Sequence, residues 1–83
     1  MKVHVRRKEK NLVEIPIETE FIKLESFLKL ANAVESGGMA KNFIQNGSVL
    51  VNGDVCTMRG KKLRPQDKIS FDGCTYVVTD HES

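Results

Sequence analysis

The chain has 83 residues, of which 40% are hydrophobic and 29% are charged, so it predicts one small globular domain and excludes both a second core and a membrane span. The net charge is only +2, but residues 1–10 and 59–68 each sum to +4, whereas residues 14–36 and 69–83 each sum to −3. A polyanion would be attracted by the two basic blocks rather than by the mean charge, and the alternative interpretation is a solvated surface of mixed charge.

The N-terminal part of the sequence predicts a basic arm followed by an edge strand. Residues 1–10 are dominated by charge, with some strand character through Val3 and Val5. Residues 12–17 alternate between the two faces expected of a strand, and Pro16 confines that strand to the edge of a sheet because proline has no N–H to donate.

Two short amphipathic helices are predicted next. Apolar residues from Leu24 to Ala31 recur at helical spacing, and Asn32 is expected to end this helix in a left-handed conformation. Ser36 is a natural N-cap for a second helix of about ten residues, and Gly47 is its stop signal. Glu25, in the first turn of the first helix, is expected to interact with the helix dipole or to anchor a loop rather than to act as a general base.

The second half of the sequence predicts short strands joined by tight turns. Asn52-Gly53 is the strongest two-residue hairpin signal, because a type I′ turn needs two positive φ angles. The expected order is a strand at 48–51, a return strand from 54, a basic loop at 59–64, a turn at 65–67, a strand through 69 and 71, a turn at 72–73 and a strand at 74–78. Because two short helices cannot bury their apolar stripes alone, we predict an α+β fold in which they pack on a small, mostly antiparallel sheet.

The cysteines and histidines argue against a metal site, and the aromatic residues are expected in the core. The chain has two cysteines, Cys56 and Cys74, which form no Cys-x-x-Cys pair, and the two histidines, His4 and His81, stand at opposite ends of the chain, so we predict no metal and no cofactor. The first ten residues hold no apolar signal core, and we expect a cytoplasmic protein with reduced thiols. We expect the aromatic residues to lie in the core rather than to stack on bases: Phe21, Phe27, Phe43, Phe71 and Tyr76.

Four sequence segments, taken in order, resemble one family pattern. They are Lys23-Leu24-Glu25, then Ser36-x-x-x-Ala40, then Ile44-x-x-Gly47-x-Val49-x-Val51-Asn52-Gly53, and finally Asp67-x-Ile69. This series resembles the S-four domain, also called the αL motif, and its spacing is kept over about 49 of the 83 residues. Residues 27–30, 35–41 and 59–63 look like the short, stand-alone bacterial subgroup often called YaaA-like or YbcJ-like.

The resemblance implies an αL fold that binds structured RNA, commonly ribosomal or transfer RNA, and that catalyses no reaction itself. It also implies a ribosome or ribosomal subunit as a partner, and we expect a monomer that does not bind membranes. The expected division is a basic arm and edge strand over residues 1–22, the RNA-binding domain over 23–79 and a tail over 80–83.

The sequence departs from the family pattern at three positions. Lys23 stands where the wider family has Arg, Gly37 replaces a basic residue at the start of the second helix, and Gln66 replaces the Gly before Asp67. The second change removes a phosphate-binding side chain, but a helix start with glycines lets a phosphate approach the backbone N–H groups closely. The predicted RNA-binding residues are Lys23, Lys29, Ser36, Gly37, Gly38, Lys41, Arg59, Lys61, Lys62 and Arg64.

Two other classes of function remain as alternatives. A protein–protein adaptor of the same fold, within a ribosome-associated complex, could use the sheet face and the acidic segment 14–36 as its contact surface. An enzyme is not expected, because the sequence has no histidine–carboxylate pair, nucleophile elbow, phosphate loop or metal cluster.

Overall fold

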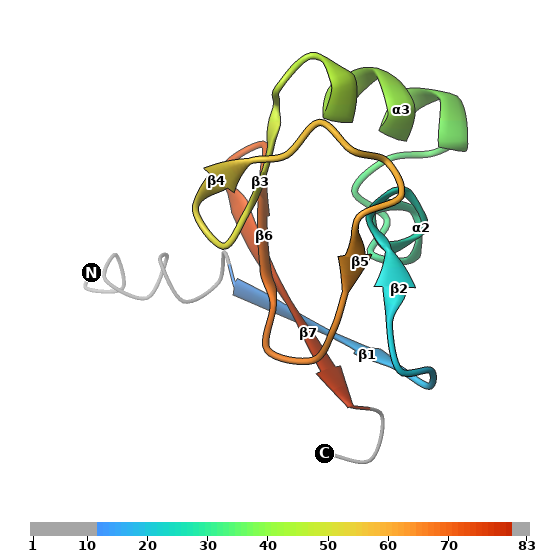
Figure 1. Cartoon of the computed structure of the whole chain (residues 1–83), viewed down its shortest axis with the longest axis vertical. Helices are drawn as coiled ribbons and strands as arrows, with labels where there is room; N and C mark the ends of the chain where they lie inside the picture. The colour runs from blue at the N-terminus through green and yellow to red at the C-terminus, as the bar shows by residue number, and fades with distance from the viewer. Residues whose placement is uncertain (1–11, 81–83) are drawn as a thin grey trace, which may run out of the picture.

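The computed structural model describes residues 12–80 and confirms the α+β class (Figure 1). The elements are, in chain order, β1 (Leu12–Ile17), β2 (Ile22–Lys23), α2 (Leu24–Leu30), α3 (Gly37–Gln45), β3 (Val49–Val51), β4 (Asp54–Val55), β5 (Lys62–Leu63), β6 (Lys68–Phe71) and β7 (Cys74–Asp80). The predicted basic arm over residues 1–10 lies outside the described residues. Within the described part, neither helix has the length or the apolar character needed to cross a bilayer.

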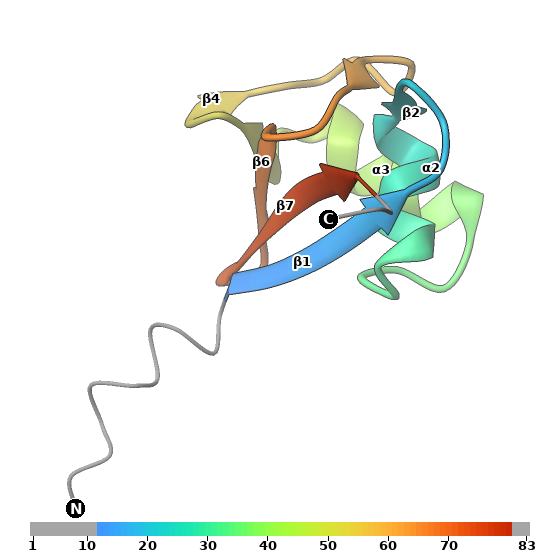
Figure 2. The same cartoon turned by 90° about the horizontal axis from the view of Figure 1, so that it is seen from below.

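Five strands form one mixed sheet in the order β1-β7-β6-β3-β4. The β3–β4, β3–β6 and β6–β7 pairs are antiparallel, whereas β1 runs parallel to β7 from the pair Leu12–Thr75 to the pair Ile17–Asp80. Figure 2 shows β1 alongside β7. The edge position of β1 is the place that the sequence predicts from Pro16.

The helix boundaries follow the local capping signals. The Ser36 Oγ accepts a hydrogen bond from the Met39 N–H at 3.2 Å, so the predicted N-cap of α3 is confirmed. Asn32, with φ 60°, and Gly47, with φ 88°, lie just beyond the two helix ends in the left-handed conformation that ends a helix. Both helices lie together on one side of β6 (Figures 1 and 2), where their apolar faces meet the sheet.

The core joins both helices to the sheet. The largest fully buried side chains are Phe27, Leu24, Leu28, Ile44, Leu63, Ile69, Val49 and Val78. The Phe27 ring meets the ring of the buried Tyr76 edge-on, with the ring centroids 6.2 Å apart. The expectation that all aromatic residues belong to the core is wrong for Phe21, which is half-buried and is not among the residues that form the core or pack against it.

A second, two-stranded sheet was not expected from the sequence. β2 and β5 pair antiparallel, with Ile22 opposite Leu63 and Lys23 opposite Lys62. Within the predicted basic loop from residue 59 to residue 64, Lys62 and Leu63 therefore form a strand. Leu63 is fully buried and attaches this small sheet to the core.

The turn before β6 carries backbone strain at Gln66. The Asp67 N–H donates to the Arg64 carbonyl oxygen at 3.0 Å, and Gln66 occupies the third position of this turn with φ 87°. A type II turn prefers Gly at this position because a side chain is disfavoured at positive φ. We expect Gln66→Gly to raise the free energy of unfolding by about 0.5–1 kcal/mol, after allowance for the greater chain entropy of Gly in the unfolded state. Urea unfolding measures this as a higher midpoint at an unchanged slope.

A glutamine in a helix supplies the matched control for this substitution. Gln45 is exposed in the last turn of α3 and has no positive φ, so Gln45→Gly is expected to lower stability by about 0.5–1 kcal/mol. A loss of stability in both variants would show that the Gln66 backbone conformation is not strained.

Candidate nucleic-acid interface

One face of the β2–β5 sheet carries three cations and an aromatic ring. Side chains alternate along a strand, so Ile22 and Leu63 turn to one face while the opposed Lys23 and Lys62 turn to the other. Phe21, one residue before Ile22, and Arg64, one residue after Leu63, continue this second face. The Lys62 Nζ lies 4.8 Å and the Arg64 Cζ 5.8 Å from the centroid of the Phe21 ring. We call Phe21, Lys23, Lys62 and Arg64 the basic face.

In the part of the chain that the structure describes, the cations of the basic face form no ion pair within 4.0 Å. Lys23 and Lys62 are both exposed and stand directly opposite each other, an arrangement that destabilises a strand pair. Among residues 12–80, one ion pair lies within 4.0 Å, and it joins Arg59 to Glu25. The basic face therefore presents a concentrated positive field that an anion with several charges would relieve.

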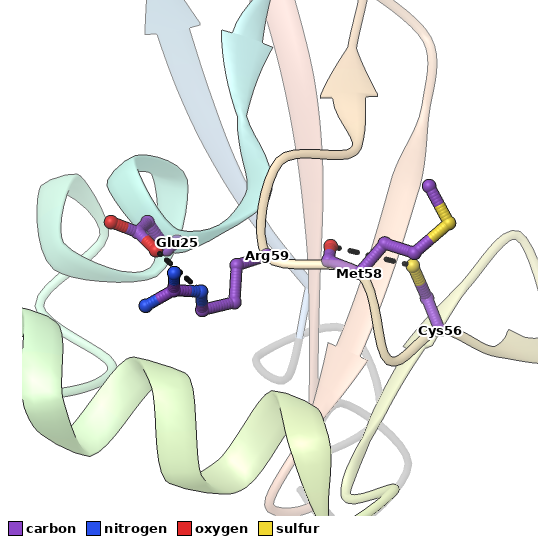
Figure 3. Close-up of polar contacts among 4 residues, drawn as sticks. All are labelled: Glu25, Cys56, Met58 and Arg59. Carbon is purple, nitrogen blue, oxygen red and sulfur yellow. Dashed lines mark hydrogen bonds and ion pairs between the residues drawn. The ribbon is translucent and has the colours of Figure 1, made fainter.

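The loop before β5 is anchored to the start of α2. The N–H groups of Leu24 and Glu25, which have no partner within the helix, donate to the carbonyl oxygens of Lys61 at 2.9 Å and Arg59 at 3.2 Å. The Arg59 side chain reaches Glu25, with 3.7 Å between Nε and Oε1 (Figure 3). Glu25 thus has the loop-anchoring position expected from the sequence, and part of the Arg59 charge is offset within the protein.

The start of α3 forms a second cationic group. The Lys29 Nζ lies 3.9 Å from the position that a Cβ at Gly37 would take, so the ammonium of α2 stands beside the first turn of α3. Gly38 and Lys41 are exposed on the same helix, with Lys41 one turn beyond Gly37. A phosphate at this helix start would meet backbone N–H groups, the positive end of the helix dipole and an ammonium.

Lys61 lies apart from these two groups. Together with Asp54 and Asp67 it lines a groove of about 400 Å³, at which the exposed side chains of Val55 and Met58 also lie. The neighbouring Lys62 turns to the basic face, because adjacent residues of an extended chain point to opposite sides. The structure thus separates two lysines that are equivalent in the sequence.

The ten predicted residues therefore fall into distinct places. Lys23, Lys62 and Arg64 lie on the basic face, Lys29, Ser36, Gly37, Gly38 and Lys41 lie at or near the start of α3, Arg59 faces Glu25, and Lys61 lines the groove. Sequence reasoning assigned Phe21 to the core and so did not predict its position beside these cations. Within residues 12–80, no three His, Cys, Asp or Glu side chains gather as they would around a metal ion.

Comparison with known proteins places the chain in a family. The family model described as the S4 domain matches residues 15–79. The curated protein named "Probable ribosome maturation protein RlbA" from Bacillus subtilis (strain 168) is 48% identical to this chain over 59 residues, which cover 71% of this chain and 83% of that protein. The residues matched by the family model include both helices, the β2–β5 sheet and nearly all of the larger sheet. This chain belongs to the S4 domain family.

Proposed function

We propose that this chain binds structured RNA, ribosomal or transfer RNA, and acts in ribosome assembly or translation as a cytoplasmic monomer that catalyses no reaction. The observation that carries the proposal is the pair Lys23 and Lys62, two exposed ammonium groups held opposite each other without a carboxylate partner within the described residues. A fold keeps such a repulsive pair at a cost in stability, and a bound row of phosphates is the ligand that removes the repulsion.

The shape of RNA also suits this surface. The major groove of A-form RNA is too deep and narrow for side chains to read, so proteins contact its phosphates, its 2′-hydroxyls and its unpaired nucleotides. Lysine and arginine side chains on a small, rigid sheet, together with a helix start, can follow a phosphate backbone without entering a groove. The similarity to a probable ribosome maturation protein supports ribosomal RNA as the first target to test.

Salt dependence tests the proposal directly. If Lys23, Lys29, Lys41, Lys62 and Arg64 contact about five phosphates, the plot of log affinity against log salt concentration is expected to have a slope of about −3.5 to −4.5. Filter binding with labelled bulk ribosomal RNA, and separately with bulk transfer RNA, gives this slope. A slope near zero on both RNAs would contradict a phosphate-binding surface.

The groove beside Lys61 favours one alternative, a protein–protein adaptor. Val55 and Met58 are 60% and 62% exposed there, and apolar side chains that are so accessible are common at protein contacts. An adaptor would recover its partner from a lysate after complete nuclease digestion. Recovery of ribosomal components that disappears on nuclease treatment would instead support RNA binding.

A further inference from the structure

Phe21 is an apolar residue that the core does not use. Its side chain is half-buried, and it is absent both from the buried cluster and from the partly buried side chains that pack on that cluster. Its contacts with charge are unusual, because two cationic heads lie within 6 Å of its ring centroid. Exposed cation–π contacts contribute only about 0.5–1 kcal/mol, so packing alone gives a weak reason for a phenylalanine at this position.

The grouping has the parts of a site for an unpaired nucleotide. Proteins that bind single-stranded nucleic acid combine cations along the backbone with aromatic rings on which bases stack. On the basic face, the cationic heads of Lys62 and Arg64 lie over the ring, and Lys23 lies one position further along the same face. A base that stacks on Phe21 would displace these exposed, mobile cations from the ring and would place its own phosphates within their reach.

A fully paired RNA would leave this ring without a ligand. Bases inside a duplex are stacked on one another, and their faces are not accessible to a protein side chain. The start of α3, in contrast, offers only groups that bind phosphate and needs no exposed base. The two cationic groups are therefore suited to different parts of one RNA.

We infer that Phe21, Lys62 and Arg64 form a subsite for an unpaired nucleotide, so that the RNA recognised by this protein has a single-stranded nucleotide next to a helix. This inference rests on the proposed function and adds the class of RNA structure to it. The base stacks on the ring, the two cations bind its flanking phosphates, and the start of α3 binds the backbone of the adjoining helix.

The test compares two hairpin RNAs that differ only in a single-stranded tail, with 2-aminopurine as a fluorescent base in that tail. We expect the wild-type protein to bind the tailed hairpin more tightly and to quench the 2-aminopurine as it stacks. Phe21→Leu keeps an apolar side chain but removes the aromatic face. This variant is expected to lose about 5- to 150-fold in affinity for the tailed hairpin, to lose the quenching, and to bind the blunt hairpin as the wild type does.

The controls distinguish a failure of the nucleotide subsite from a failure of RNA binding as a whole. Leu12→Ala removes an exposed apolar side chain from β1, outside the basic face, and is expected to leave both affinities unchanged. Phe21→Leu must first unfold at the wild-type urea midpoint, which shows that it is folded. If this folded variant still prefers the tailed hairpin and quenches 2-aminopurine like the wild type, the subsite is overturned and RNA binding is left intact. Failure of the wild type to bind either hairpin in low salt would overturn the proposed function itself.

Discussion

The double substitution Lys23→Gln and Lys62→Gln is expected to weaken RNA binding by about 10- to 100-fold, the loss of two charge-assisted phosphate contacts. The slope of log affinity against log salt concentration should become shallower by about 1.4–1.8, because two fewer counterions are released. Both lysines are exposed. Glutamine is hydrophilic and preserves most of the length of lysine, so the fold should persist. Filter binding at four or more salt concentrations measures both quantities.

The single variant Lys23→Gln is expected to be more stable than the wild type. Like charges directly opposite each other on paired strands repel, and removal of the Lys23 charge should raise the free energy of unfolding by about 0.2–1 kcal/mol while Lys62 keeps its contact with the Phe21 ring. A gain in stability that accompanies a loss of affinity would identify a repulsion that is kept for binding. A loss of stability in Lys23→Gln would show instead that Lys23 supports the fold through its aliphatic stem.

Lys68 provides the matched control for a single charge. It is exposed in β6, on the larger sheet, and belongs to neither cationic group. We expect Lys62→Gln to weaken binding by about 3- to 10-fold, whereas Lys68→Gln should change it by less than about twofold. Equal losses in the two single variants would mean that RNA responds to net charge and not to the basic face.

The parts of the fold that the sequence predicts are those that local chemistry decides. Ser36 caps its own helix through the N–H three residues on, and Asn52-Gly53 forms its turn with φ angles of 52° and 90°. Capping and turn formation need only a few neighbouring residues, so the pattern in the chain carries the information. The same holds for the edge position of β1, which follows from Pro16.

Long-range pairing decides the parts that the sequence does not predict. β2 and β5 have two residues each and lie far apart in the chain, so neither shows a recognisable alternation by itself. Once they pair, the register turns Lys62 toward Lys23 and leaves Lys61 at the groove. The parallel pairing of β1 with β7 likewise joins the two ends of the described chain and leaves no local signal.

The pairing also changes the interpretation of individual side chains. Phe21 follows an apolar pattern in the sequence, but its partner strand presents two cations to it and the core excludes it. Arg59 is one of a basic series in the sequence, but the fold gives it a carboxylate partner in Glu25. The participation of the ten predicted residues in RNA binding remains a prediction, which the variants described above address.

Asp67→Ala is expected to lower the free energy of unfolding by about 2–3 kcal/mol, because one carboxylate ties two separate segments together. Its Oδ2 accepts the Arg64 N–H at 2.9 Å, and its Oδ1 accepts the Asn52 Nδ2 at 3.2 Å. The Asn52 side chain continues the connection, since its Oδ1 accepts the Lys68 N–H at 3.0 Å. Hydrogen bonds to a charged acceptor contribute about 1.5–3 kcal/mol, and because both of these bonds are exposed to solvent, the expected loss for the pair stays in the range of one such bond. Urea unfolding of the variant measures the loss.

A double-mutant cycle with Asn52→Ala separates this network from unrelated damage. Asn52→Ala also introduces strain at a positive φ, so its own loss is expected to be about 2 kcal/mol, but that strain cancels in the cycle. We expect a coupling energy of about 0.5–1.5 kcal/mol between the two positions, and an intermediate loss for Asp67→Asn, which keeps one acceptor oxygen. Additivity within about 0.3 kcal/mol would show that the two side chains act independently. Because Asp67 fixes the backbone of Arg64, coupling would also mean that the hairpin turn at Asn52 helps to hold one cation of the basic face in place.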